Sequence, residues 1–273
     1  MIGATVKEVG VLITKSTCQL LNNKAGTKEF PVPNGCSVLL EFNNNFYCIS
    51  NAHVLADNNY GKTYFLEGRG ITSNMGGKIF NSNPGDGEPR SKDIFDLAVV
   101  QLASQTVAAL KRSGKSFISI NDIKTGHKLS KSDTLFFVGY PASKTQVKIS
   151  ETKTVQRRPF FFLTHPVLLS RPKNAIHTTD FHVIAKYSKS KTRNFSTHDE
   201  AVGPSPRGMS GSGIWLISEV NFEIKAELVG IFSEYHENRS ILIGSKIDLY
   251  IDLIKQEIDS TIPNSGIKIK LLK

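Results

Sequence analysis

The chain has 273 residues, 39% of them hydrophobic, and a formal net charge of +10. This length accommodates one large domain or two fused halves, each with its own core. The 21 glycines and 11 prolines are ordinary for a folded protein, and no run approaches the roughly 20 apolar residues of a membrane span. The composition therefore predicts neither a low-complexity chain nor a membrane-spanning one.

The first eight residues lack the apolar core and the cleavage site of a signal peptide. The chain has three cysteines, and an odd, small number does not make a disulfide framework. They are Cys18, Cys36 and Cys48. These features predict a soluble protein of the reducing cytoplasm.

Short apolar runs, separated by turn-forming residues, predict strands along most of the chain. The predicted strands cover residues 9–14, 37–42, 46–50, 97–102, 134–138, 160–169, 182–187, 214–218, 224–232 and 241–247. Three asparagines at 43–45 indicate a hairpin turn between the second and third of these strands. Residues 57–89 are polar and predict loops around one or two short strands.

Only the end of the chain is clearly helical by pattern, because apolar residues recur at helical spacing over 248–258. Residues 106–112 indicate one further short helical turn. Many strands at short intervals with one terminal helix favour a barrel or a sandwich over an alternating βαβ fold.

The basic residues are spread along the chain and are densest over 144–158 and 186–193. A solvated, lysine-rich surface is the favoured interpretation, and affinity for nucleic acid is the alternative. The sequence has no zinc-ligand spacing and no glycine-rich phosphate loop. We therefore expect no cofactor and no metal.

The most informative segment is 208–213, in which Ser210 is surrounded by glycines. A serine hydroxyl needs a base to take its proton and a third group to orient that base. His53 follows a predicted strand, and Asp96 immediately precedes another, so a histidine, a carboxylate and a glycine-flanked serine occur in the order that such a triad can take.

Other residues compete for these roles. Asp93 and Asp57 are alternative acids, Ser212 is a second glycine-flanked serine, and His198 is a second histidine. An α/β-hydrolase is disfavoured because that fold carries its triad in the order serine, acid, histidine.

Segments 51–55, 96–100, 138–141 and 208–213 together resemble the chymotrypsin-like serine peptidases, and within them the intracellular bacterial type. The resemblance covers most of the chain, from about Ser37 to Ile258. It implies an all-β fold of two six-stranded antiparallel β-barrels with a C-terminal α-helix. The first barrel would span 1–130 and the second 131–273, as one peptidase domain.

The resemblance also implies roles for individual residues. Ser210 would be the nucleophile, His53 the general base and Asp96 the group that orients the base. The backbone N–H groups of Gly208 and Ser210 would form the oxyanion hole, and the substrate would be a protein or peptide.

Aligning the strand around residue 230 with the family places Ser233, Glu234 and Tyr235 along the substrate backbone. The base of the specificity pocket would lie near Pro204 or the next residue, and its wall near Leu242. None of these last residues is acidic, so the sequence favours a small or apolar residue before the cleaved bond, while the acidic Glu234 leaves a different preference open.

Two departures from the family pattern bear on regulation. Secreted members carry an aspartate before the nucleophile, where this chain has Met209, so activation by N-terminal cleavage is not expected. They also have a disulfide beside the catalytic histidine, where this chain has Val54, so Cys36 and Cys48 are interpreted as core residues. A cytoplasmic peptidase without such a switch needs another restraint, and we expect narrow specificity, a closed loop or a regulatory protein partner.

Overall fold

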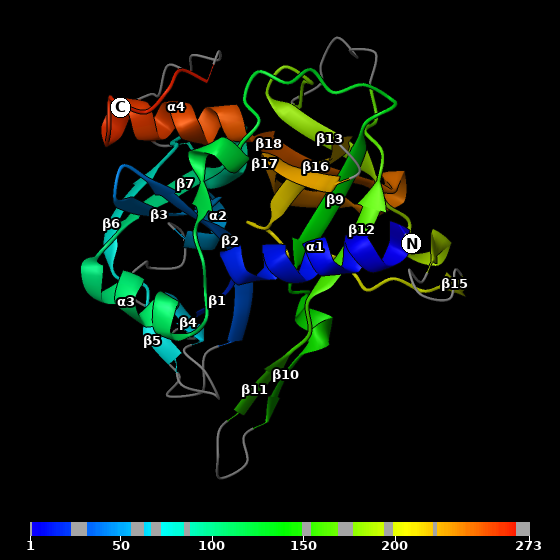
Figure 1. The fold of residues 1–273 in the computed structure, drawn as a ribbon, viewed down its shortest axis with the longest axis horizontal. Helices are drawn as coiled ribbons and strands as arrows, with labels where there is room; N and C mark the ends of the chain where they lie inside the picture. Colours follow the sequence, from blue (N-terminus) through cyan, green and yellow to red (C-terminus); the bar gives the residue numbers. More distant parts are fainter. Residues whose placement is uncertain are drawn as a thin grey trace.

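The computed structural model describes residues 2–22, 32–55, 63–66, 72–84, 88–148, 154–168, 177–193, 199–220 and 223–265. Within these residues two curled antiparallel sheets lie side by side, and helices cover the junction between them (Figure 1).

The first sheet contains the first eight strands of the chain. Its strand order is β5-β4-β1-β2-β3-β7-β6, and the short strand β8 pairs in parallel with β2. The bounds are β1 Thr17–Asn22, β2 Val32–Phe42, β3 Asn45–Asn51, β4 Thr63–Leu66, β5 Thr72–Asn74, β6 Gly77–Asn81, β7 Leu97–Leu102 and β8 Ile118–Ser119.

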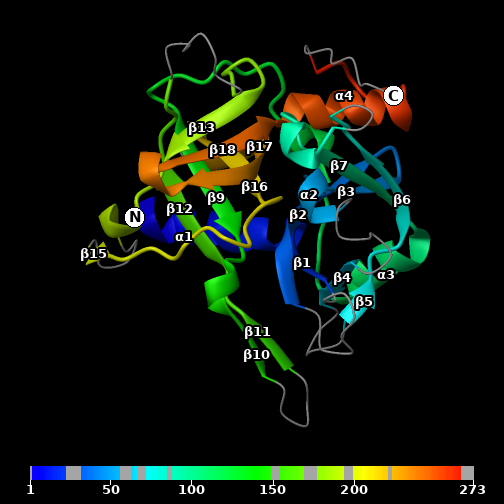
Figure 2. The same cartoon turned by 180° about the vertical axis from the view of Figure 1, so that it is seen from behind.

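The second sheet has six strands in the order β12-β9-β16-β17-β18-β13. Their bounds are β9 Thr134–Gly139, β12 Phe160–Thr164, β13 His182–Lys186, β16 Gly213–Val220, β17 Glu223–His236 and β18 Ile241–Lys246. Two small hairpins stand apart from both sheets. They are β10 Thr145–Lys148 with β11 Thr154–Arg157, which projects from the body in both views, and β14 Thr192–Arg193 with β15 Glu200–Ala201 (Figures 1 and 2).

Four α-helices complete the described fold: α1 Ile2–Ser16, α2 Ala52–Leu55, α3 Ser104–Arg112 and α4 Ile247–Glu257. Short 3₁₀ turns occur at Arg90–Lys92, Ile120–Asp122, Ala142–Lys144, Lys189–Lys191 and Glu237–Arg239. Helix α1 contacts β1 and β2 of the first sheet and β9 and β17 of the second, and α4 contacts β6 and β7 as well as β17 and β18. Both long helices therefore join the two sheets.

The N-terminal prediction was wrong, because residues 9–14 belong to helix α1 and not to a strand. The buried positions Val6, Gly10 and Ile13 recur every three or four residues, which is a helical period, while Leu12 is exposed. A short apolar run alone does not distinguish a buried strand from a helix face. The first strand, β1, follows this helix and was not predicted.

The predicted β2–β3 hairpin, strand β7 and two helical segments are confirmed. The hairpin of β2 and β3 turns through Asn43 and Asn44, both at positive φ (47° and 60°), a conformation that asparagine tolerates. Strand β7 has the predicted bounds, and α3 and α4 occur where helical segments were expected. The region 57–89 holds three short strands, β4 to β6, and parts of it lie outside the described residues.

The core is continuous across the two sheets. One buried cluster joins residues of both sheets to α1 and α4, and two further clusters fill the first and second sheets separately. All three cysteines are buried and none is in a disulfide, as expected for core residues. Such a shared core fixes the sheets relative to each other and so defines the geometry between them.

The fold class predicted from the sequence is confirmed in its architecture: the described chain is mostly β, with two curled antiparallel sheets and a helix near its C-terminal end. The first sheet carries more strands than the six expected. The division of the chain at residue 130 stays a prediction. No helix in the described ranges combines the length and the apolarity needed to cross a bilayer.

Candidate active site

Strand pairing brings His53 and Asp96 together. Strands β3 and β7 are antiparallel, with Asn51 opposite Leu97. Because antiparallel neighbours run in opposite directions, the end of β3 lies beside the start of β7. His53 lies in α2, directly after β3, and Asp96 directly precedes β7.

The two side chains form a short contact. His53 Nδ1 and Asp96 Oδ2 are 2.6 Å apart, and the backbone N–H of His53 donates to Asp96 Oδ1 at 2.9 Å. A carboxylate oxygen accepts hydrogen bonds, so His53 Nδ1 is the donor in this contact. The contact fixes the orientation of the imidazole, and 41% of its side chain is exposed.

The backbone around Asp96 adopts an uncommon conformation. Its φ is 51°, in the left-handed region that costs most residues about 1–3 kcal/mol but that aspartate tolerates better. The neighbouring Asp93 holds this turn, because its Oδ1 accepts the N–H groups of Phe95 and Asp96. Asp93, the competing acid in the sequence, thus supports the turn, and the carboxylate bonded to His53 is that of Asp96.

The loop with Ser210 is clamped between the two sheets. The N–H of Cys36, on β2, donates to the Ser210 carbonyl at 2.7 Å. On the other side, the N–H of Gly211 donates to the Phe232 carbonyl at 2.7 Å, and the N–H of Phe232 donates to the Ser212 carbonyl at 2.8 Å. The position of Ser210 therefore depends on both sheets.

Two glycines shape this turn. Gly208 and Gly211 have φ values of 85° and 89°. A Cβ on Gly211 would lie 1.9 Å from the Cys36 carbonyl oxygen, and one on Gly208 would lie 2.8 Å from the Ala142 nitrogen. Both positions require glycine for conformation and for space.

The turn leaves two backbone donors without a partner among the described residues. Neither the N–H of Gly208 nor that of Ser210 donates to another described residue. These are the two groups that the sequence predicted for an oxyanion hole. Unused backbone donors beside a serine can bind an oxygen that gains negative charge.

The hydroxyl of Ser210 donates to the carbonyl oxygen of Ser233 at 2.9 Å. A hydroxyl has one proton, so in this state Ser210 does not also donate to His53. For His53 to accept that proton, the hydroxyl must first give up its hydrogen bond to Ser233.

Ser233 has a second contact that sequence reasoning missed. Its Oγ donates to Asp96 Oδ2 at 2.9 Å, beside the His53 contact. The sequence placed Ser233 along the substrate backbone but carried no signal for this bond, since the two residues are 137 positions apart. One residue on β17 thus contacts both the acid and the serine.

Cys36 is a second missed residue. Burial raises the pKa of its thiol to about 12, so the thiol stays protonated and its Sγ donates to the Gly208 carbonyl at 3.4 Å. The same sulfur accepts the N–H of Tyr140 at 3.4 Å. The Cys36 side chain on β2 therefore supports the glycine turn by its contact with the Gly208 carbonyl.

The competing serine is placed differently. Ser212 is fully buried, and its hydroxyl has no hydrogen-bond partner among the described residues. Met209 is also buried, in the hydrophobic cluster of the second sheet. The other competitors, Asp57 and His198, lie outside the described residues.

The predicted specificity residues are spread over the second sheet. Glu234 Oε2 lies 2.7 Å from His236 Nε2. The Tyr235 ring packs edge-on against the Tyr187 ring, with the two ring centroids 5.6 Å apart. Leu242 is buried in the core cluster of the second sheet. These contacts do not test the predicted substrate-binding roles, which stay predictions.

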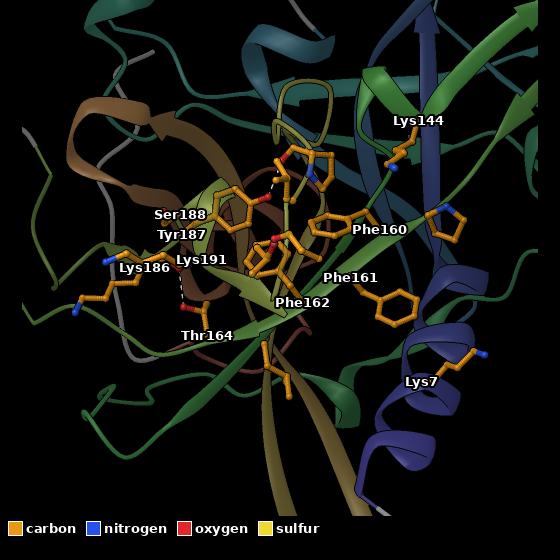
Figure 3. A pocket seen from close by; sticks show the side chains of 17 residues that line it. Lys7, Lys144, Phe160, Phe161, Phe162, Thr164, Lys186, Tyr187, Ser188 and Lys191 are labelled. Carbon is orange, nitrogen blue, oxygen red and sulfur yellow. Dashed lines mark hydrogen bonds between the residues drawn. The ribbon is translucent and has the colours of Figure 1, made fainter. Parts of the chain in front are cut away.

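Pro204 lies elsewhere, in the wall of a cavity of about 850 Å³ (Figure 3). Tyr187 donates its hydroxyl to the Pro204 carbonyl at 2.6 Å, which fixes this wall. The three phenylalanines of β12 and the lysines 7, 144, 186 and 191 also line the cavity. His53, Asp96 and Ser210 are not among its lining residues.

Comparisons with known proteins give only a weak likeness of fold. No protein-family model matches the chain, and no curated protein matches it. Among solved structures, the tobacco vein mottling virus protease is similar with a TM-score of 0.46 and 14% identity, over 96% of this chain and 89% of that one. A Glu endopeptidase in complex with MPD has a TM-score of 0.49 and 16% identity, over 90% and 91% of the two chains. Similarity this low assigns no residue role or activity to this chain.

Proposed function

We propose that the protein is a serine endopeptidase that cleaves peptide bonds through an acyl-enzyme. The observation that carries this proposal is the contact of Asp96 with both the imidazole of His53 and the hydroxyl of Ser233, whose carbonyl in turn accepts the Ser210 hydroxyl. This chain of contacts joins a base, its orienting acid and a nucleophile across the two sheets.

In the proposed reaction, the Ser210 hydroxyl first turns from Ser233 to Nε2 of His53. His53 takes the proton while Ser210 Oγ bonds to the carbonyl carbon of the substrate. The oxygen that becomes negative accepts the N–H groups of Gly208 and Ser210. His53 then gives the proton to the leaving amine, and water releases the acyl group in the same way.

We also propose that the activity is restrained in the free chain. The support is the orientation of the Ser210 hydroxyl, which is bound to Ser233 and not available to His53. A regulatory protein partner or the substrate itself would reorient it. The three buried cysteines, none of them in a disulfide, are compatible with the cytoplasmic, intracellular setting that belongs to this proposal.

The cleavage preference belongs to the same proposal. Ser233, Glu234 and Tyr235 would pair with the substrate backbone, and a small or apolar residue would precede the cleaved bond.

A second candidate is a catalytically silent binding module with the same fold. It is favoured by the same Ser210–Ser233 hydrogen bond, which withholds the proton from the base. The charge of +10 would give such a module salt-sensitive affinity for nucleic acid.

Hydrolysis of a mixed peptide library by the purified chain separates the two candidates. The peptidase proposal predicts new peptide ends that appear with the wild type and vanish with Ser210→Ala. Hydrolysis that survives in Ser210→Ala would refute the assigned nucleophile. A wild type that is inert alone and with lysate, but binds nucleic acid in low salt, would favour the binding module.

A further inference from the structure

Beyond the proposed triad, three potential metal ligands gather at the far end of strand β17. Glu234, which directly follows Ser233, and His236 lie on this strand, and His177 comes from the segment that precedes β13. The potential ligand atoms of the three side chains all lie within 4.8 Å of one another. The sheet order places β13 next to β18 and β18 next to β17, which brings these distant segments together.

The contacts within the cluster centre on one carboxylate oxygen. Glu234 Oε2 is 2.7 Å from His236 Nε2 and 3.8 Å from His177 Nε2. Glu234 and His236 are adjacent positions of the same strand face, since side chains two residues apart point to the same side. The cluster is therefore preformed by the strand and completed by His177.

His177 supplies an independent indication of a ligand. Its Nδ1 is buried and has no hydrogen-bond partner among the described residues, and its Nε2 is too far from Glu234 for a hydrogen bond. The nitrogen nearest Glu234 is Nε2, which at 3.8 Å is close to the carboxylate without a hydrogen bond to it. A cation shared with Glu234 and His236 would bond to this Nε2 and fill the gap between the two side chains.

The donor set identifies the class of ion. Two imidazoles and one carboxylate suit a borderline transition metal, whereas calcium and magnesium prefer oxygen ligands throughout. Three protein ligands leave a fourth position of a tetrahedral zinc site for water. Such water has access here, because 21% of the His177 side chain, 46% of Glu234 and 38% of His236 are exposed.

We propose that His177, Glu234 and His236 form a zinc-binding site at the end of strand β17. Zn–N and Zn–O bonds are about 2.0–2.2 Å long, so binding would draw the three side chains together around the ion. This changes the expectation from the sequence, which showed no metal-ligand spacing. The ligands come from separate segments, so no local motif could announce them.

The test is calorimetric titration of the untagged protein with ZnCl₂, repeated with Co²⁺ to follow its visible absorption. We expect one Zn²⁺ per chain, and in each of His177→Ala, Glu234→Gln and His236→Ala a loss of affinity at least as large as the roughly 10- to 100-fold that removal of an outer-shell partner costs. Co²⁺ should give the visible bands of a low-coordinate site with the wild type only.

The matched control is His127→Ala. His127 Nε2 contacts Asp133 Oδ2 at 2.9 Å, so this variant removes another histidine–carboxylate pair from the surface. Zinc binding should be unchanged in it. Absence of binding to the wild type would overturn the proposal, and so would affinity that survives in the three ligand variants while circular dichroism shows them folded. None of these readouts depends on peptidase activity.

Discussion

At the scale of single residues, the site depends on a few atoms with more than one contact. Asp96 accepts from the backbone and ring of His53 and from Ser233, while its own backbone is held at positive φ by Asp93. Cys36 contacts the serine turn through its N–H and its thiol. Substitution by a residue of similar size can therefore remove one of these contacts while disturbing the packing little.

The first prediction concerns the acid. Asp96→Asn preserves shape but presents an amide N–H or a weaker acceptor to His53, which favours the wrong tautomer. We expect kcat for peptide hydrolysis to fall by about 10⁴. Asp133→Asn is the matched control, because Asp133 also contacts a histidine but lies outside the site. Equal rates for Asp96→Asn and the wild type would contradict the assigned role.

The second prediction concerns the glycine turn. Gly211→Ala places a Cβ against the Cys36 carbonyl at positive φ, so we expect the free energy of unfolding to fall by about 3 kcal/mol or more. Gly114 also has positive φ, 77°, but nothing lies within 4 Å of its Cβ position. Gly114→Ala should therefore cost only about 1–2 kcal/mol in urea unfolding. Similar losses in both variants would show that the close approach is not important.

The third prediction concerns Lys115, whose Nζ donates to the carbonyls of Thr14 and Thr17. Burial lowers its pKa from 10.5 to about 8. Below pH 8 the folded and unfolded chains are both protonated, and the cost of burying the charge is fully present. Between pH 8 and 10.5 the folded state releases its proton first, so the stability of the folded state rises.

The comparison is between the wild type and Lys115→Met. Raising the pH from about 7 to about 10 should improve the unfolding free energy of the wild type relative to the variant by about 2–3 kcal/mol. A difference that is flat over this range, or that falls, would contradict a buried lysine.

At the scale of elements, local patterns predicted what local interactions determine. The asparagine turn of the β2–β3 hairpin, strand β7 and helix α4 were found from residues adjacent in sequence. Helix α1 was missed because its apolar run is short and its helical face shows only when the helix packs on both sheets. The contacts of Ser233 and Cys36 with the triad region join distant segments, so no spacing in the sequence could reveal them.

Helix α1 gives the fourth prediction. Ile13 is 6% exposed and its neighbour Leu12 is 60% exposed. Ile13→Ala should lower the free energy of unfolding by about 2–5 kcal/mol, because it leaves a cavity in the core. Leu12→Ala is the matched control and should change it by less than about 0.5 kcal/mol. Comparable losses in urea unfolding would contradict the orientation of the helix.

At the scale of the whole molecule, the site exists only where the two sheets meet. His53 and Asp96 come from the first sheet, and Ser210 and Ser233 come from the second. Two further bonds from the second sheet fix the loop before Asp96, since His182 and Ser245 contact the carbonyls of Ile94 and Phe95. Whatever changes the fit between the sheets should therefore change the reactivity of Ser210.

The fifth prediction belongs to this scale and concerns the proposed zinc site. Zinc would fix the side chains of Glu234 and His236, which lie on β17, the strand that is proposed to pair with substrate. Saturating Zn²⁺ should slow the reaction of Ser210 with a peptide-based phosphonate in the wild type, and should not slow it in His236→Ala. Equal slowing of both proteins would place the inhibitory ion elsewhere.

The most direct measurement is labelling of the purified protein with a fluorophosphonate probe, followed by mass spectrometry of the modified peptide. The account predicts a single modification on Ser210, lost in Ser210→Ala and His53→Ala and retained in Ser212→Ala, the buried neighbour that serves as control. Labelling of Ser212, or labelling that persists in His53→Ala at the wild-type rate, would contradict the proposed triad.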